Sequence, residues 1–594
     1  MILQALTAYY EQLLRTGQIA APGWDHSFKV SYWLRIGPDG QLLDLVDCRQ
    51  LVPKGKKEVL APREMPVPAH VKRSSGIAAN FLCDNSTYLL GADEKGKPER
   101  SRQCFEVCAA LHHKLLDGVD SPVARAILAF LDTWKPENAP SHPLLAPCWK
   151  DLTNNANLLF DYEGPEGRIL ANEDEAIQNA WQQYYSSRTP ADAATVQCLV
   201  TGKQAPAEKT HPSIKGVKDA QSSGAALVSF NAPAFCSYGH EQGENAPVSE
   251  YAAFAYTTAL NKLLADRDHC RILGDTTVVC WAENASPGYA SLGMMGMFGV
   301  PEDAGVPEDA GVTEDDLRKA LELLADGRPC PWLNQEMLQP GQHFYILGLS
   351  PNAARISVRF FLRDTFEVFA QRLQRYADET EIVRPANDKW AALPIWALVR
   401  ETVNQNARDK KPSPQLAGDL LRAVLTGGRY PATLLNGAVL RIRAEQSVTR
   451  GRAAILKAYY LRNEPTDINK EVFTVSLNES TNVPYILGRL FSVLEAVQSA
   501  ANPGINTTIK DRYFNSACAT PALVFPTLLK LAQKHLQKIG GGLAVSYSQQ
   551  ITGLMALVPD DGFPARLSLP DQGKFEIGYY HQTQKRYTKK NEEE

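Results

Sequence analysis

The chain has 594 residues, of which 44% are hydrophobic and 22% charged, and its formal net charge is -4 at pH 7. This length exceeds what one hydrophobic core supports and predicts roughly two to four domains. The slightly acidic balance excludes a uniformly basic coat for nucleic acid, so any contact with nucleic acid must come from local patches.

The N-terminal segment predicts a helix that faces a core, because Ile2, Leu6 and Leu13 follow helical spacing. It has no basic region of the kind that opens a signal peptide. No run approaches the roughly 18 apolar residues that a membrane span needs. The 11 cysteines are scattered singly, which is typical of a reduced chain. We therefore expect a soluble cytoplasmic protein without contact to a membrane.

Strand-like and helical runs alternate through the first two-thirds of the chain. The predicted strands are 29–34, 41–46, 87–90, 227–230, 276–281, 344–348 and 355–362, and two predicted helices are 102–116 and 176–185. Later the helical pattern dominates, over 365–377, 390–404, 415–426, 450–460, 485–500 and 522–538. The sequence predicts an α+β multidomain fold, a mixed α/β N-terminal body followed by a mainly helical C-terminal bundle, with domains at 1–364, 365–470 and 471–594.

A basic segment rich in proline follows the second predicted strand. Prolines 53, 62, 66 and 68 keep it from folding as a helix, so we expect an extended arm that can follow a phosphate backbone. The alternative is an ordinary solvated loop. The candidate DNA-binding residues of this part are the basic Lys54, Lys56, Lys57, Lys72 and Arg73, with Ser74, Ser75, Asn80 and Asn85 near base edges.

A polar loop joins the predicted strand 227–230 to a helix that is expected to begin at about Ser249. Its uncharged donors and acceptors suit the reading of a base edge or a phosphate and do not suit hydrolysis. The alternative is a buried network that stiffens the core. The candidates are Asn231, Ser237, Tyr238, Gln242 and Asn245.

A basic stripe is predicted on the helix near residue 530. Lys530, Lys534 and Lys538 recur every four residues, which places them on one face. Such a stripe can guide a displaced DNA strand, or it can be the solvated face of an ordinary amphipathic helix.

No catalytic centre or cofactor site is predicted. Cys104, Cys108 and His112 share a helical face but lack the paired CxxC turns of structural zinc, so core cysteines beside a partly exposed histidine are expected. Gly293, Gly296 and Gly299 lack the Walker lysine and predict a flexible apolar loop.

Stretches across nearly the whole chain resemble the Csd-one family, the large subunit of the subtype I-C CRISPR surveillance complex (Cascade). They are 73–91 (RSSGIAANFLCDNSTYLLG), 227–264, 274–283 (GDTTVVCWAE), 343–361, 485–498, 506–531 and 578–587 (GYYHQTQKRY), in the family's order. The resemblance implies a non-catalytic subunit that recognises the protospacer-adjacent motif in duplex DNA. Base pairing with the guide then reads the target itself.

The resemblance also implies partners. These are the guide RNA ribonucleoprotein, the backbone and guide-end-capping subunits, target double-stranded DNA, the helicase-nuclease, and a small subunit made from this chain's own C-terminal region. Methionine is absent between Met337 and Met555. Internal translation of that small subunit is therefore expected to start at a non-AUG codon, which is read here as Val or Leu, within roughly 472–494.

Two other classes of function stay open on the sequence. One is a purely structural assembly subunit without DNA readout, which the near-neutral charge allows. The other is a nuclease or RNA-processing factor with an unrecognised site, although no motif organises the acidic residues into an acid–base pair.

Overall fold

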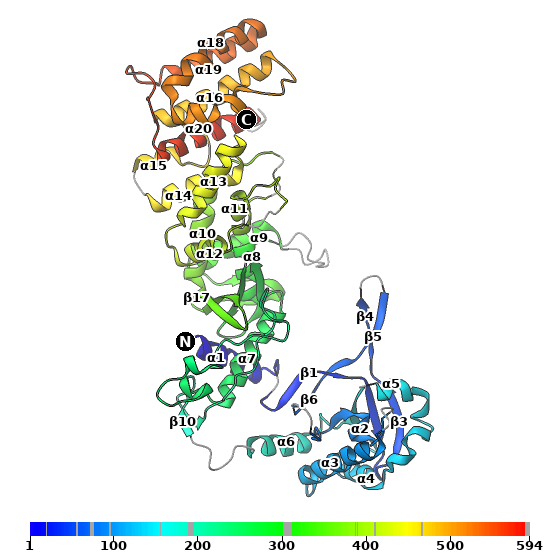
Figure 1. Ribbon diagram of the computed structural model, residues 1–594. Helices are drawn as coiled ribbons and strands as arrows, with labels where there is room; N and C mark the ends of the chain where they lie inside the picture. The colour runs from blue at the N-terminus through cyan, green and yellow to red at the C-terminus, as the bar shows by residue number, and fades with distance from the viewer. Residues whose placement is uncertain are drawn as a thin grey trace. The chain divides into compact units, whose positions relative to one another are not determined.

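The computed structural model describes residues 1–19, 21–54, 57–71, 76–93, 97–154, 156–187, 195–300, 312–386, 388, 390–408, 412–464 and 467–587. The chain forms two compact units (Figure 1). Unit 1 consists of Met1–Tyr9, Thr210–Cys236 and Thr257–Glu594, and unit 2 of Tyr10–Lys209 and Ser237–Tyr256. The division falls within two helices, α1 (Ile2–Arg15) and α7 (Glu250–Ala265).

Unit 2 is built on a mixed sheet with the strand order β3-β2-β8-β7, and β9 pairs with β8. Only the β2–β8 pair is parallel. The strands are β2 (Tyr32–Ile36), β3 (Leu42–Asp47), β7 (Cys83–Asn85), β8 (Asn157–Gly164) and β9 (Gly167–Leu170), and the helices that accompany them are α2 (Ser86–Leu89), α3 (Pro98–Leu116), α4 (Pro122–Thr133), α5 (Trp149–Thr153) and α6 (Glu175–Ser187). Buried side chains such as Leu34, Ile127 and Phe160 form its core.

Two further ladders of unit 2 carry the basic segment. β1 (Trp24–Val30) pairs with β6 (Arg63–Pro68), and β4 (Gln50–Lys54) pairs with β5 (Lys57–Ala61), all antiparallel. The β4–β5 hairpin extends away from the rest of its unit (Figure 1). The backbone is thus extended, as the prolines predict, but it is paired as a hairpin rather than free. β10 (Thr195–Gln197) and β11 (Gln204–Pro206) form a small separate hairpin.

Unit 1 contains an antiparallel sheet with the order β12-β13-β16-β17. Its strands are β12 (Cys270–Leu273), β13 (Thr276–Ala282), β16 (His343–Asn352) and β17 (Arg355–Thr365), with a minor pair β14 (Cys330–Pro331) and β15 (Met337–Leu338). The helices α8 (Pro287–Phe298), α9 (Glu314–Ala325) and α10 (Phe366–Thr380) pack with it into one hydrophobic core.

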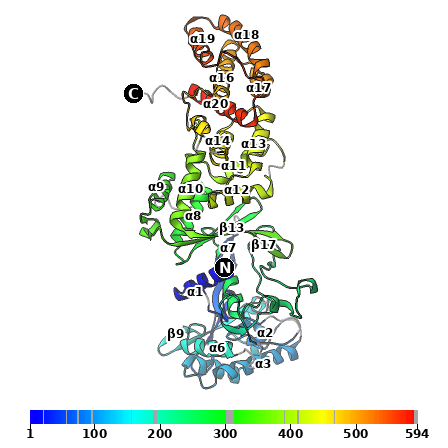
Figure 2. The same cartoon turned by 90° about the vertical axis from the view of Figure 1, so that its left-hand side faces the viewer.

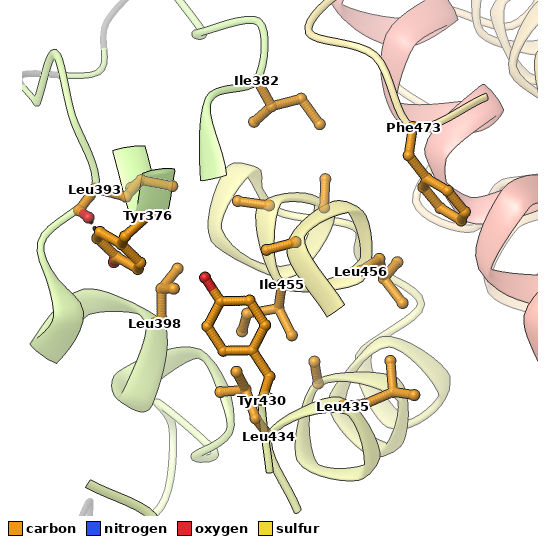
Figure 3. Close-up of a cluster of buried hydrophobic side chains, with 14 of the residues drawn as sticks. Tyr376, Ile382, Leu393, Leu398, Tyr430, Leu434, Leu435, Ile455, Leu456 and Phe473 are labelled. Carbon is orange, nitrogen blue, oxygen red and sulfur yellow. Dashed lines mark hydrogen bonds between the residues drawn. The ribbon is translucent and has the colours of Figure 1, made fainter. Parts of the chain in front are cut away.

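The next helices surround one buried helix, α14 (Arg450–Asn463). The helices in this part of the chain are α11 (Ile395–Glu401), α12 (Pro414–Thr426), α13 (Ala432–Glu445) and α15 (Asp467–Val472). α10, α11, α13 and α15 all contact α14. Figure 3 shows Ile455 and Leu456 of α14 among side chains of the surrounding helices, where Tyr376 Oη donates a hydrogen bond to the Leu393 carbonyl at 2.8 Å. Burial of this apolar surface stabilises this part of unit 1.

α14 also carries four buried cations, Arg450, Arg452, Lys457 and Arg462. Each has an anionic or carbonyl partner, as buried charges require. Arg462 Nη2 lies 2.6 Å from Glu379 Oε2, and Lys457 Nζ donates to the Asp378 carbonyl at 2.8 Å.

Five helices form the C-terminal bundle: α16 (Val483–Ala501), α17 (Ile509–Ala519), α18 (Pro521–Ile539), α19 (Gly541–Met555) and α20 (Leu569–Tyr587). Glycines bring α16 and α20 into backbone contact, because a Cβ at Gly488 would overlap the Phe575 carbonyl and one at Gly578 the Tyr485 carbonyl. α20 runs beside both α16 and α14 (Figure 2).

The predicted α+β class, with a mixed N-terminal part and a largely helical C-terminal part, is confirmed. Two predicted strands are wrong. Residues 87–90 fall in α2 and the turn after it, because Asn85 caps that helix by accepting a hydrogen bond from Thr87 N at 3.1 Å. Residues 227–230 form no strand, since the ladder stops at a single bridge between Ala226 and Arg355.

The predicted flexible loop at Gly293 and Gly296 is helix α8 instead, and both glycines allow close packing against Phe344 and Leu373. Among the residues described, no helix is long and apolar enough to cross a membrane.

Candidate nucleic-acid interface

The loop from Ser237 to Asn245 is held together by one amide side chain. Asn245 Oδ1 accepts a hydrogen bond from Ser237 N at 2.9 Å, and Asn245 Nδ2 donates to the carbonyls of Gln242 at 3.0 Å and His240 at 3.3 Å. Asn245 therefore spans the loop internally, which fixes its shape before any ligand arrives.

Tyr238 lies at the exposed tip of this loop. Its side chain is 99% exposed, and its backbone is left-handed with φ of 54°. Gln242 is also left-handed, with φ of 45°. Non-glycine residues adopt this conformation rarely and at a cost, so the surrounding bonds must hold them there.

Asn231 belongs to a different cluster, in unit 1. Its Oδ1 accepts a hydrogen bond from Arg355 Nη2 at 2.8 Å, and the Arg355 guanidinium lies 4.1 Å from the centre of the Phe235 ring. The positively charged Arg355 side chain thus contacts both an aromatic ring and an amide oxygen at an exposed edge of unit 1. Sequence reasoning missed Arg355, because only the fold brings β17 next to residues 231–235.

Asn80 and Asn85 serve the local backbone. Asn80 is buried, its Oδ1 accepts from Val71 N at 2.9 Å, and its Nδ2 lies 3.0 Å from His70 Nδ1. Asn85 is the N-cap of α2. These bonds order the segments that flank residues 72–75.

Most of the predicted basic arm lies outside what the structure describes. Lys56, Lys72, Arg73, Ser74 and Ser75 fall in the undescribed ranges, and for Lys54 and Lys57 only the backbone, at the ends of β4 and β5, is described. The adjoining hairpin exposes aliphatic side chains, with Leu51 62% and Leu60 56% exposed. Lys54 at the end of β4 and Lys57 at the start of β5 therefore adjoin an apolar, solvent-facing hairpin.

The lysine stripe is present as the spacing predicts. Lys530, Lys534 and Lys538 are all exposed on α18, while Leu528 and Ala532 of the same helix are buried in the bundle. Lys538 Nζ donates to Asn502 Oδ1 at 2.7 Å. The positive stripe thus faces water along about two turns of helix.

The residues with shifted pKa lie mainly in the core rather than at these surfaces. Cys104, Cys108 and His112 are buried, so the predicted core cysteines are confirmed, but His112 is not partly exposed; only its neighbour His113 is. His112 Nε2 accepts from Leu82 N at 3.0 Å, which leaves Nδ1 to donate to the Cys108 carbonyl at 2.8 Å. Burial lowers the pKa of His112 to about 4, so it is neutral.

A protein-family model matches nearly the whole chain. The family model described as CRISPR-associated protein (Cas_Csd1) covers residues 6–587. The chain belongs to the Cas_Csd1 family. No curated protein matches it significantly.

The family assignment confirms the predicted resemblance and makes the chain a CRISPR-associated, Cascade-type protein. Both surfaces described above, the Ser237–Asn245 loop and the stripe on α18, fall within the matched residues. In the described ranges, no group of three or more His, Cys, Asp or Glu side chains is placed to hold a metal ion.

Proposed function

We propose that this Cas_Csd1 chain is the non-catalytic large subunit of a type I-C CRISPR RNA-guided surveillance complex. It recognises the protospacer-adjacent motif in duplex DNA, stabilises the R-loop and its displaced strand, and docks the helicase-nuclease. The observation that carries this proposal is the family match from residue 6 to residue 587. A match of this extent includes every surface to which the proposal assigns a role.

Two separate surfaces would divide the contact with DNA. Residues 54–57, residues 72–75 and the loop at Ser237–Asn245, all of unit 2, would meet the flanking duplex, and so would Asn231 of unit 1. Lys530, Lys534 and Lys538 would follow the phosphates of the displaced strand. The domains 1–364, 365–470 and 471–594 remain part of this proposal, as do the backbone, guide-end-capping and small subunits as partners.

The test is DNA binding by the reconstituted guide-loaded complex. Targets with correct and scrambled flanking motifs are compared with and without this subunit, across a salt series. We expect discrimination between the flanks to disappear when the subunit is omitted. If discrimination survives without it, the chain is an assembly subunit only.

A variant with Lys54→Gln and Lys57→Gln probes the adjoining ends of β4 and β5 in the same assay. We expect weaker binding and a shallower dependence of log Kobs on log salt, because each lost phosphate contact lowers the slope by about 0.9. Lys150→Gln, an exposed lysine of the same unit, is the matched control. DNA cleavage by the isolated chain with added metal ions would instead favour the nuclease alternative.

A further inference from the structure

The exposed tyrosine at the tip of the Ser237–Asn245 loop has no role in the fold of its own unit. Tyr238 is 99% exposed, so removal of its ring takes no packing from the core. Yet its backbone is held in a left-handed conformation, followed by Gly239 with φ of 78°. This conformation belongs to the turn that His240 N closes by donating to the Ser237 carbonyl at 3.0 Å, and the turn leaves the ring in solvent, where a partner can reach it.

The loop is anchored as well as closed. Gly243 N donates to the Lys209 carbonyl at 3.2 Å, and a Cβ at Gly243 would overlap the Glu208 carbonyl. Glu241 and Glu244 form a reciprocal capping box, in which Glu241 N donates to Glu244 Oε2 at 3.1 Å. With the three bonds of Asn245, these contacts preorganise the tip and reduce the entropy lost on binding.

The charges of the loop restrict what the ring can meet. Glu241 and Glu244 are both exposed, and two carboxylates next to the tip repel a phosphate backbone. Stacking of an aromatic ring on a nucleobase needs no positive charge and tolerates any base sequence. The loop therefore suits the face of a base better than the edge of a phosphodiester chain.

We propose that Tyr238 stacks on a nucleobase of the target DNA beside the flanking motif, and that Asn245 is the positioning residue that holds the ring in place. This inference rests on the proposed function, because it requires that this chain meets the flanking duplex. Tyr238 contacts the base by stacking, whereas Asn245 acts within the loop and does not read a base.

The test uses the complete guide-loaded complex and target DNA that carries 2-aminopurine at successive positions beside the flanking motif. Stacking on Tyr238 quenches the fluorescence of the probe that it covers. We expect Tyr238→Ala to weaken binding about tenfold and to remove the quenching, since stacking contributes on this scale. Tyr238→Phe should keep both, because the ring is retained. Leu199→Ala removes another exposed apolar side chain of unit 2, 62% exposed, and should change neither signal.

Asn245→Ala separates positioning from a general loss of structure. Alone it should weaken binding as Tyr238→Ala does, but in the Tyr238→Ala background it should add nothing, because the ring it positions is gone. Additive losses would overturn the positioning role.

The outcomes also distinguish this inference from the proposed function. If omission of the subunit abolishes flank discrimination while Tyr238→Ala leaves affinity and quenching unchanged, the stacking is refuted and the proposed function stands. If Tyr238→Ala prevents assembly of the complex on a sizing column, the ring contacts a protein subunit, and the inference is again refuted.

Discussion

A buried carboxyl in the last helix makes the stability of unit 1 depend on pH. Glu576 on α20 is 1% exposed, and its Oε2 has no hydrogen-bond partner among the described residues. Burial raises the pKa of Glu576 from 4.5 to about 8, although the positive charge of Arg443 opposes the shift. Cys518 and Tyr460 lie in the same environment. The folded chain therefore keeps this proton at neutral pH, while the unfolded chain releases it.

The sign and size of the effect follow from this difference. The protonated Glu576 carboxyl contributes fully to the free energy of unfolding below pH 4.5, and this contribution is lost as the pH rises to about 8. Between pH 6 and pH 8 the loss amounts to about 2 kcal/mol of unfolding free energy, at about 1.4 kcal/mol per pKa unit. Glu576→Gln is neutral in both states, so the variant should gain about 2 kcal/mol relative to the natural chain over this range.

The assay is urea unfolding followed by far-ultraviolet circular dichroism, for both proteins at pH 6 and pH 8. The difference between the two proteins is needed because His112 and His581 act in the opposite direction: burial lowers the pKa of each to about 4. Glu479→Gln, in an exposed loop of the same unit, should show no such gain. An equal pH dependence for the natural chain and Glu576→Gln would refute the reasoning.

Two further changes test the C-terminal bundle. Replacement of Lys530, Lys534 and Lys538 by glutamine should lower the slope of log Kobs against log salt for the displaced strand by about 2, at about 0.7 for each charge; an unchanged slope would show that the stripe is only a solvated face. Gly488→Ala should lower the unfolding free energy by about 1–3 kcal/mol, because its Cβ would overlap α20. Gly553→Ala, with no atom within 4 Å, is its control in thermal unfolding and should be neutral or slightly stabilising.

Local patterns predicted the elements whose own residues decide their structure. The helix at 415–426 follows from helical periodicity and the strand at 276–281 from a run of strand-forming residues, and both are present as α12 and β13. Local patterns failed to predict the structure where pairing with a residue far along the chain determines it. Residues 227–230 are rich in strand formers, but the adjacent chain reaches β17 only at Ala226.

The same distinction applies to the candidate interface. Spacing alone placed the three lysines on one face of a helix, because i, i+4 neighbours share a face by geometry. The internal hydrogen bonds of Asn80 and Asn245 could not be predicted, since the sequence gives the residue type and not the atoms it meets. Arg355 was missed for a related reason, because its partners lie more than a hundred positions earlier in the chain.

The packing of α20 against α14 bears on any shorter product of this gene. The Tyr460 ring of α14 lies against Gly573, and Tyr580 Oη donates to the Val383 carbonyl at 2.7 Å. A polypeptide that begins within residues 472–494 would contain α20 but neither Tyr460 nor Val383. Its uncovered flank would be apolar and carry an unpaired phenol, so such a fragment should self-associate when purified alone and gain solubility when a neighbouring chain covers that flank.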